Sequence, residues 1–274
     1  MRGAFYNLVN FINTTEINDV YSNSAKIILE NISKIPDYTI TDVANLCYVS
    51  TATISRLCRK LNYESFADFK MDVTMNLRYF NKDSERMQFD HQLPVLPVDG
   101  KTTKELFIDH FENIVHNLRS TYNTIQFEEL EKVVDMIHDS DEICFAGNFF
   151  TQSVSMQLQI ELAYLEKKCT AMYPLNCQKE IVRILSKNDV IIVSSIAGGY
   201  WNDHPDMMRE ISKSKARKIC ITQVEDFPYF DSFDIIIRVG TDHLSLIGKF
   251  SITYIFEVLE ALYHMKYASD CKKK

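Results

Sequence analysis

Glycine and proline are scarce in this chain of 274 residues, with seven and six copies, whereas phenylalanine and tyrosine number 17 and 14. Turns between β-strands depend on glycine and proline, so the composition disfavours an all-β fold and favours helices. No apolar run approaches the ~18 residues that a membrane helix requires. Asn7 and Asn10 also interrupt the N-terminal segment before a signal-peptide core can form. We therefore expect a cytoplasmic protein without a membrane partner.

Charge and metal-ligand patterns are also weak. The 30 Lys and Arg residues and 37 Asp and Glu residues give a net charge of −7, which indicates no polyanion partner but can hide a local basic surface. The seven cysteines are scattered and never form a C-x-x-C pair, so we expect reduced, mostly buried thiols. The seven histidines show no H-E-x-x-H spacing. Neither a metal site nor a cofactor is expected.

The hydrophobic pattern divides the chain into two domains. Residues 1–81 carry short runs of helical apolar spacing, and helices this short must pack together. From residue 82 to 104 the periodicity is lost, and Pro94 and Pro97 interrupt a polar stretch that is typical of a linker. In residues 105–274 short apolar runs alternate with helical segments. The sequence thus predicts an all-helical N-terminal domain, a linker and an α/β domain.

The apolar runs of the second domain predict strands buried on both faces, as in a parallel sheet. These runs lie at residues 143–146, 190–194, 218–222 and 235–239, with a weaker one near 170–173. The segments between them are long enough for right-handed β-α-β crossovers. Helices are expected at about 105–122, 127–138 and 244–267. A doubly wound α/β domain follows from this pattern.

Residues 39–61 form the most informative segment of the first domain. Their apolar positions are spaced so that two short helices joined by a tight turn bury one shared face, as in a helix-turn-helix motif. These positions are Val43, Ala44, Leu46, Val49, Ile54, Leu57 and Leu61. Ser50 is a natural N-cap for the second helix. Further on, Ser65 and Asp68 have the spacing of a capping box and predict another helix start.

The outer face of the second helix carries short hydroxyls and cations. The hydroxyls can reach phosphates or bases, and the cations can bind the DNA backbone or guanine. The residues expected to contact DNA are Ser50, Thr51, Thr53, Ser55, Arg56, Arg59 and Lys60. A solvated surface helix is the alternative, but it would not require the turn, the cap and the clustered cations together.

These motifs resemble the helix-turn-helix domain of the RpiR (MurR/RpiR) family of bacterial transcriptional regulators, over roughly residues 1–80. The resemblance rests on Ser50-x-x-Thr53-Ile54-Ser55-Arg56-Leu57-Cys58-Arg59-Lys60-Leu61, followed by Phe66-Ala67-Asp68-Phe69-Lys70. Tyr48 departs from it, because it stands in the turn where the family usually has glycine, so a residue with a Cβ must adopt the left-handed conformation. The family joins this domain to a sugar isomerase (SIS) domain, an α/β/α sandwich that binds a phosphosugar effector in many members. The resemblance implies that fold for residues 105–274.

The resemblance also places an effector site at the carboxyl ends of the parallel strands, where helix N-termini favour anions. The first loop of this site, residues 145–151, aligns with a family G-x-G-x-S pattern, in which Phe149 replaces the second glycine. The second loop, residues 194–200, aligns with a pattern close to S-x-S-G-x-T, in which Ala197 and Tyr200 replace hydroxyl-bearing residues. The residues expected to bind the effector are Gly147, Asn148, Thr151, Ser194, Ser195, Gly198 and Gly199.

These replacements leave the identity of the ligand undecided, because a phosphate pocket needs several converging hydrogen-bond donors. The effector can be a phosphosugar or another small molecule, or the SIS domain can be a degenerate domain that binds nothing and only dimerises. Trp201 can line the pocket or fill the core, and Glu161 and Glu166 are expected at solvated or interface positions.

The expected function is transcriptional regulation. A homodimer or higher homo-oligomer would place paired recognition helices on a palindromic operator in double-stranded DNA and control sugar-metabolism genes in response to a small molecule. A sugar-phosphate isomerase-like enzyme is the alternative. The second loop offers no carboxylate to act as a base beside a sugar, so we assign no catalytic residue.

Overall fold

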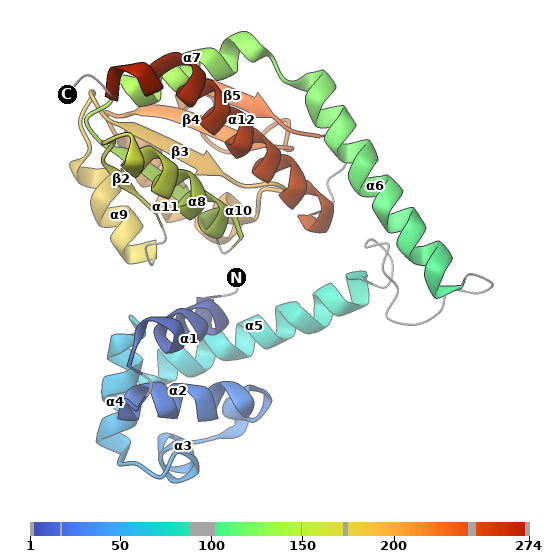
Figure 1. Cartoon of the computed structure of the whole chain (residues 1–274). Helices are drawn as coiled ribbons and strands as arrows, with labels where there is room; N and C mark the ends of the chain where they lie inside the picture. The colour runs from blue at the N-terminus through green and yellow to red at the C-terminus, as the bar shows by residue number, and fades with distance from the viewer. Residues whose placement is uncertain are drawn as a thin grey trace. The chain divides into compact units, whose positions relative to one another are not determined.

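The computed structural model describes residues 3–16, 18–87, 102–148, 150–171, 175–240 and 245–271. The chain forms two compact units, Met1–Phe89 and Asp90–Lys274. The first unit is helical and the second is α/β (Figure 1). Helix α5 (Phe66–Met87) continues past residue 82, where the linker was expected to begin, and Pro94 and Pro97 lie outside the described residues. The linker boundaries stay a prediction.

The first unit packs its helices around one apolar core. Besides α5, its elements are α1 (Gly3–Thr14), α2 (Val20–Glu30), the 3-10 helix η1 (Ile32–Asp37), α3 (Ile40–Leu46) and α4 (Thr51–Lys60). Side-chain caps begin four of the helices: Asp19 for α2, Thr39 for α3, Ser50 for α4 and, as predicted, Ser65 for α5. The fully buried side chains include Ile54 and Leu57 of α4. The apolar face that the sequence predicted for the second helix of the motif is therefore the inner, buried face of α4.

The second unit is built around a parallel sheet. The strands are β1 (Ile143–Gly147), β2 (Cys169–Thr170), β3 (Val190–Ser194), β4 (Arg217–Thr222) and β5 (Ile235–Arg238). The helices are α6 (Thr103–Thr124), α7 (Phe127–His138), α8 (Phe150–Tyr164), α9 (Leu175–Ile184), α10 (Gly199–Asp203), α11 (Pro205–Lys213) and α12 (Ser245–Cys271), with a 3-10 turn, η2 (Phe230–Ser232). The strand order is β2-β1-β3-β4-β5, and every pair is parallel. The expected α/β fold class is confirmed.

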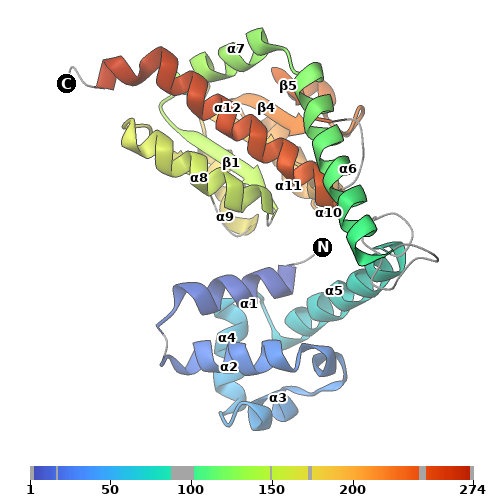
Figure 2. The same ribbon diagram turned by 45° about the vertical axis from the view of Figure 1, so that its right-hand side comes forward.

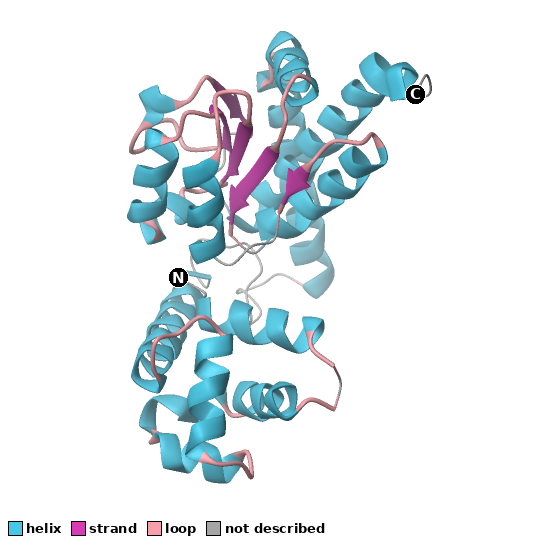
Figure 3. Cartoon of the chain, turned by 90° about the vertical axis from the view of Figure 1, so that its left-hand side faces the viewer, coloured by secondary structure: helices cyan, strands magenta, loops and turns pink. Residues whose placement is uncertain are grey.

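Helices cover both faces of this sheet (Figure 3). Alternate strand residues belong to two separate cores: Phe145 and Ile192 pack with α7, α8 and α12, whereas Cys144 and Ile191 pack with α9 and α11. Burial on both faces explains why the strands are continuous apolar runs in the sequence. Among the described residues, no helix has the length and apolar character that a membrane span requires.

Candidate DNA-binding surface and effector site

The turn between α3 and α4 has the expected left-handed conformation. Tyr48 has a φ of 56°, and the amide of Val49 donates to the carbonyl of Ala44 at 2.9 Å, which closes the turn. The Tyr48 side chain is 92% exposed, so it contributes little packing within the unit. Tyr48 lies beside the N-terminus of α4. The sequence predicted only its role in the turn, and its exposure on the surface was not predicted.

Ser50 caps α4 as predicted. Its Oγ accepts a hydrogen bond from the backbone amide of Thr53 at 3.1 Å and lies 2.9 Å from the Thr53 hydroxyl. The cap satisfies one of the amides that a helix N-terminus leaves unpaired. It also positions both hydroxyls at the end of α4 that carries the partial positive charge of the helix dipole.

The expected DNA contacts lie mostly on the exposed side of α4. Ser50, Thr51, Arg56, Arg59 and Lys60 are exposed, and Thr53 and Ser55 are half-buried. Among the described residues, no carboxylate forms an ion pair with either arginine. The two guanidinium groups are thus available to phosphates or base edges.

Lys60 has a different environment. Its Nζ lies 5.0 Å from the centre of the Tyr21 ring in α2, at a cation–π distance. This contact draws the end of Lys60 towards α2. Lys60 therefore has an aromatic partner within the same unit.

The candidate effector site lies where the strand order of the sheet reverses. The chain moves from β1 outward to β2 and then crosses back to β3 on the other side of β1. In open α/β sheets, ligands bind at this position, outside the carboxyl ends of the two central strands. Gly147 and Ser194, the last residues of β1 and β3, are register partners. The two expected loops therefore begin side by side.

The first loop is tightly packed. A Cβ on Gly147 would lie 2.3 Å from Oγ1 of Thr151 and 3.0 Å from the carbonyl oxygen of Ser194. The hydroxyl of Thr151 donates to the carbonyl of Asn148 at 2.8 Å, so its proton is already used within the loop. Phe149, which replaces the second family glycine, lies outside the described residues.

The second loop places two serines differently. The Ser194 hydroxyl is buried and has no hydrogen-bond partner among the residues that the structure describes. Oγ of Ser195 accepts from the backbone amide of Tyr200 at 3.1 Å, which leaves its own proton to donate. Gly198 is left-handed, with a φ of 79°, and a Cβ on Gly199 would contact nothing within 4 Å. Two hydroxyl donors and one open backbone position, Gly199, are therefore found at this loop.

Tyr200 connects the two loops beneath the site. Its hydroxyl donates to Oε1 of Gln178 at 2.8 Å, and Nε2 of Gln178 donates to the carbonyl of Gly147 at 3.2 Å. The ring is 1% exposed, and this burial raises the pKa of Tyr200 well above its ordinary value. Tyr200 is thus a core residue, not a ligand donor.

Trp201 also fills the core. It is buried and stacks on Phe227, with ring centres 4.5 Å apart and planes inclined by 22°. Of the two roles that the sequence left open for Trp201, the structure supports the filling of the sandwich.

The sequence did not indicate a buried polar network behind the second loop. Gln223, which follows β4, donates through its backbone amide to the carbonyl of Ile196 at 3.0 Å. Its side-chain Nε2 lies 3.4 Å from Oδ1 of Asn117 in α6, and Nδ2 of Asn117 donates to Ser251 in α12 at 2.7 Å. These residues are far apart in the sequence, so no local spacing could have revealed them.

Residues 13–78 match the helix-turn-helix domain of the rpiR family. The chain is 23% identical over 223 residues to an HTH-type transcriptional regulator of Caldanaerobacter subterraneus, covering 80% of this chain and 74% of that protein. A solved structure of the Vibrio vulnificus NanR protein complexed with ManNAc-6P is similar at a TM-score of 0.52, with 19% identity and coverage of 97% of this chain and 94% of that chain.

The sugar isomerase domain of an RpiR transcription factor from Sphaerobacter thermophilus is also similar to this chain. Its TM-score is 0.52 at 20% identity, and the match covers 62% of this chain and 95% of that one. Residues 13–78 therefore belong to the rpiR family of helix-turn-helix domains, and the second unit has the α/β fold of a sugar isomerase domain.

Proposed function

We propose that this protein is a DNA-binding transcriptional regulator that controls sugar-metabolism genes in response to a small molecule bound by its α/β unit. The observation that carries the proposal is the outer face of α4, whose cap, buried inner face and exposed Arg56 and Arg59 fit a helix inserted into a major groove. The rpiR-family match over residues 13–78 supports it. The protein would act as a homodimer or higher homo-oligomer on a palindromic operator.

The DNA-binding part is tested with a duplex selected by the wild-type protein from a random-sequence pool. We expect Arg56→Ala to weaken binding in fluorescence anisotropy by at least about tenfold if Arg56 contacts a base, with reduced discrimination between sequences. If Arg56 contacts only phosphate, all sequences weaken alike and the salt dependence becomes shallower. Arg119→Ala, at an exposed position of α6, is the matched control. Equal affinities of the Arg56→Ala, Arg59→Ala and control variants would contradict the proposed surface.

For the effector we favour a small anion such as a phosphosugar. Support comes from the hydroxyls of Ser194 and Ser195 at the reversal point of the sheet, and from the solved NanR structure of the same fold that holds ManNAc-6P. Thermal shift against phosphosugars, the corresponding free sugars and inorganic phosphate tests this, since a ligand that binds only the native state raises its stability. We expect Ser195→Ala to reduce the shift while operator affinity without ligand is unchanged. If no compound of the panel raises the melting temperature, the result would favour a domain that only dimerises.

The isomerase alternative has its own test. Tyr200 is buried beneath the loops, and we assign no catalytic residue. Incubation of the purified protein with phosphosugars, followed by NMR, should show no interconversion of aldose and ketose phosphates. Turnover above that of a heat-inactivated sample would overturn the assignment of a regulator without enzyme activity.

A further inference from the structure

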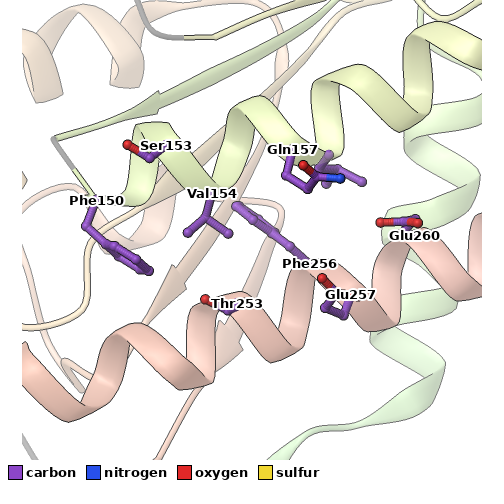
Figure 4. Close-up of a pocket in the computed structure, with 9 residues that line it drawn as sticks. Phe150, Ser153, Val154, Gln157, Thr253, Phe256, Glu257 and Glu260 are labelled. Atoms are coloured by element: carbon purple, nitrogen blue, oxygen red, sulfur yellow. The ribbon is translucent and has the colours of Figure 1, made fainter. Parts of the chain in front are cut away.

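Helices α8 and α12 lie side by side on one face of the sheet (Figure 2). Residues of both helices line a groove between them. The groove has a volume of about 330 Å³. Phe150 and Val154 line one end, whereas Glu257 and Glu260 line the other (Figure 4). The polar end is remote from the effector loops, because it lies more than two turns along α8 from Thr151.

Two carboxylates and an imidazole meet at this polar end. Glu260 and His264 are four residues apart on α12, so their side chains lie on the same face. Glu161 comes from α8. One oxygen of each glutamate and one ring nitrogen of His264 all lie within 4.8 Å of one another. The sequence suggested that Glu161 is a solvated or interface residue. In the structure it belongs to this cluster.

The cluster has negative charge without a matching cation. The carboxylates of Glu161 and Glu260 belong to the cluster, and Glu257 lines the same end of the groove. In the part of the chain that the structure describes, no lysine or arginine forms an ion pair with any of these three glutamates. Like charges at this spacing repel, so the native state would be stabilised by a bound cation.

A neighbouring amide supports Glu161. Nε2 of Gln157, one turn earlier on α8, donates to Oε1 of Glu161 at 3.5 Å. Metal-binding carboxylates commonly have such an outer hydrogen bond, which fixes the orientation of the ligand. Gln157 also lines the groove, so it is a positioning residue between the groove and the cluster.

We propose that Glu161, Glu260 and His264 bind a divalent transition-metal ion, with Zn²⁺ the best match. Imidazole nitrogen selects against Mg²⁺ and Ca²⁺, which prefer oxygen ligands alone, and a set of one nitrogen and two carboxylate groups suits Zn²⁺. Three protein ligands leave a coordination position for water or a small anion. The ion would connect α8 to α12 across the polar end of the groove.

The test uses the full chain, freed of any affinity tag and treated with EDTA before dialysis. We expect a titration with Zn²⁺, followed by calorimetry, to show one site per chain with a micromolar or tighter dissociation constant. His264→Ala and Glu161→Gln should each weaken this site by at least about tenfold. His116→Ala and Glu112→Gln, at exposed positions of α6, are the matched controls and should bind Zn²⁺ like the wild type.

Cysteine thiolates are the competing ligands in this chain, and Co²⁺ distinguishes them. The proposed site predicts weak visible d-d bands without the intense near-ultraviolet charge-transfer band of cobalt–thiolate bonds. A thiolate band, equal Zn²⁺ affinity of the cluster and control variants, or no binding tighter than millimolar would each overturn the proposal. Circular dichroism of the variants verifies that they fold. Because operator binding is measured separately, failure of this site leaves the proposed regulator function untouched.

Discussion

The hydroxyl of Tyr200 donates to Oε1 of Gln178 at 2.8 Å, and Nε2 of the same Gln178 donates to the carbonyl of Gly147. This buried pair connects the loop after β3 to the end of β1 through α9. Tyr200 stands where the family pattern has a different hydroxyl-bearing residue. Its side chain thus connects the two loops from beneath the site. The shape of the candidate effector site therefore depends on a core contact.

Tyr200→Phe should destabilise the protein by about 1–3 kcal/mol, because it removes the buried hydrogen bond that the side-chain Oε1 of Gln178 accepts from the Tyr200 hydroxyl. Urea denaturation followed by circular dichroism measures the change. Tyr164→Phe is the control, since Tyr164 is 78% exposed and its variant should stay within about 0.5 kcal/mol of the wild type. Equal stability of the two variants would show that the Tyr200 bond is dispensable.

Tyr48→Gly should be more stable than Tyr48→Ala by about 1 kcal/mol, because alanine keeps the strain of a left-handed residue that glycine relieves. The side chain is almost fully exposed, so neither variant loses buried packing. Comparison of the two midpoints in urea isolates the backbone effect. A more stable alanine variant would argue against the left-handed turn.

Ser50→Ala should cost about 1 kcal/mol in the absence of DNA, because the amide of Thr53 loses its cap. Ser50→Asp should retain most of the stability, since aspartate is an equally good cap. Its negative charge should nevertheless weaken operator binding by repelling phosphate. Thermal denaturation and anisotropy measure the two effects separately, and an Asp variant with unchanged DNA affinity would remove Ser50 from the proposed interface.

Gly147→Ala should destabilise the second unit by about 1–3 kcal/mol, because the new methyl group would collide with Thr151 and with the backbone of Ser194. Gly199→Ala is the matched control. That position is open and starts α10, so alanine should be tolerated there or slightly stabilising. Differential scanning calorimetry distinguishes the two. A neutral Gly147→Ala variant would mean that the first loop is looser than described.

The buried thiols should resist alkylation in the native protein. Burial raises the pKa of Cys58 and Cys144 to about 12 and that of Cys47 to about 11, so almost no thiolate is present at pH 8. Mass spectrometry after a short iodoacetamide treatment should find these three unmodified, whereas all seven cysteines react in urea. Fast native labelling of Cys58 would indicate that the first unit opens readily.

Local patterns were sufficient for much of the fold. The helix-turn-helix spacing, the Ser50 cap and the left-handed Tyr48 depend on residues within a few positions of one another, and all three agree with the structure. The strands were also found, because burial on both faces leaves continuous apolar runs. Helix α7 begins and ends at the predicted residues.

Tertiary structure decided which side chains face the site. Family patterns align Tyr200 with a ligand-binding position, yet the sandwich turns its ring into the core towards Gln178. The Gln223 and Asn117 contact joins residues more than 100 positions apart. Glu161 likewise meets Glu260 and His264 only because α8 and α12 pack together. Periodicity reports which face of an element is apolar, whereas contacts between distant elements exist only once the sheet and its helices are assembled.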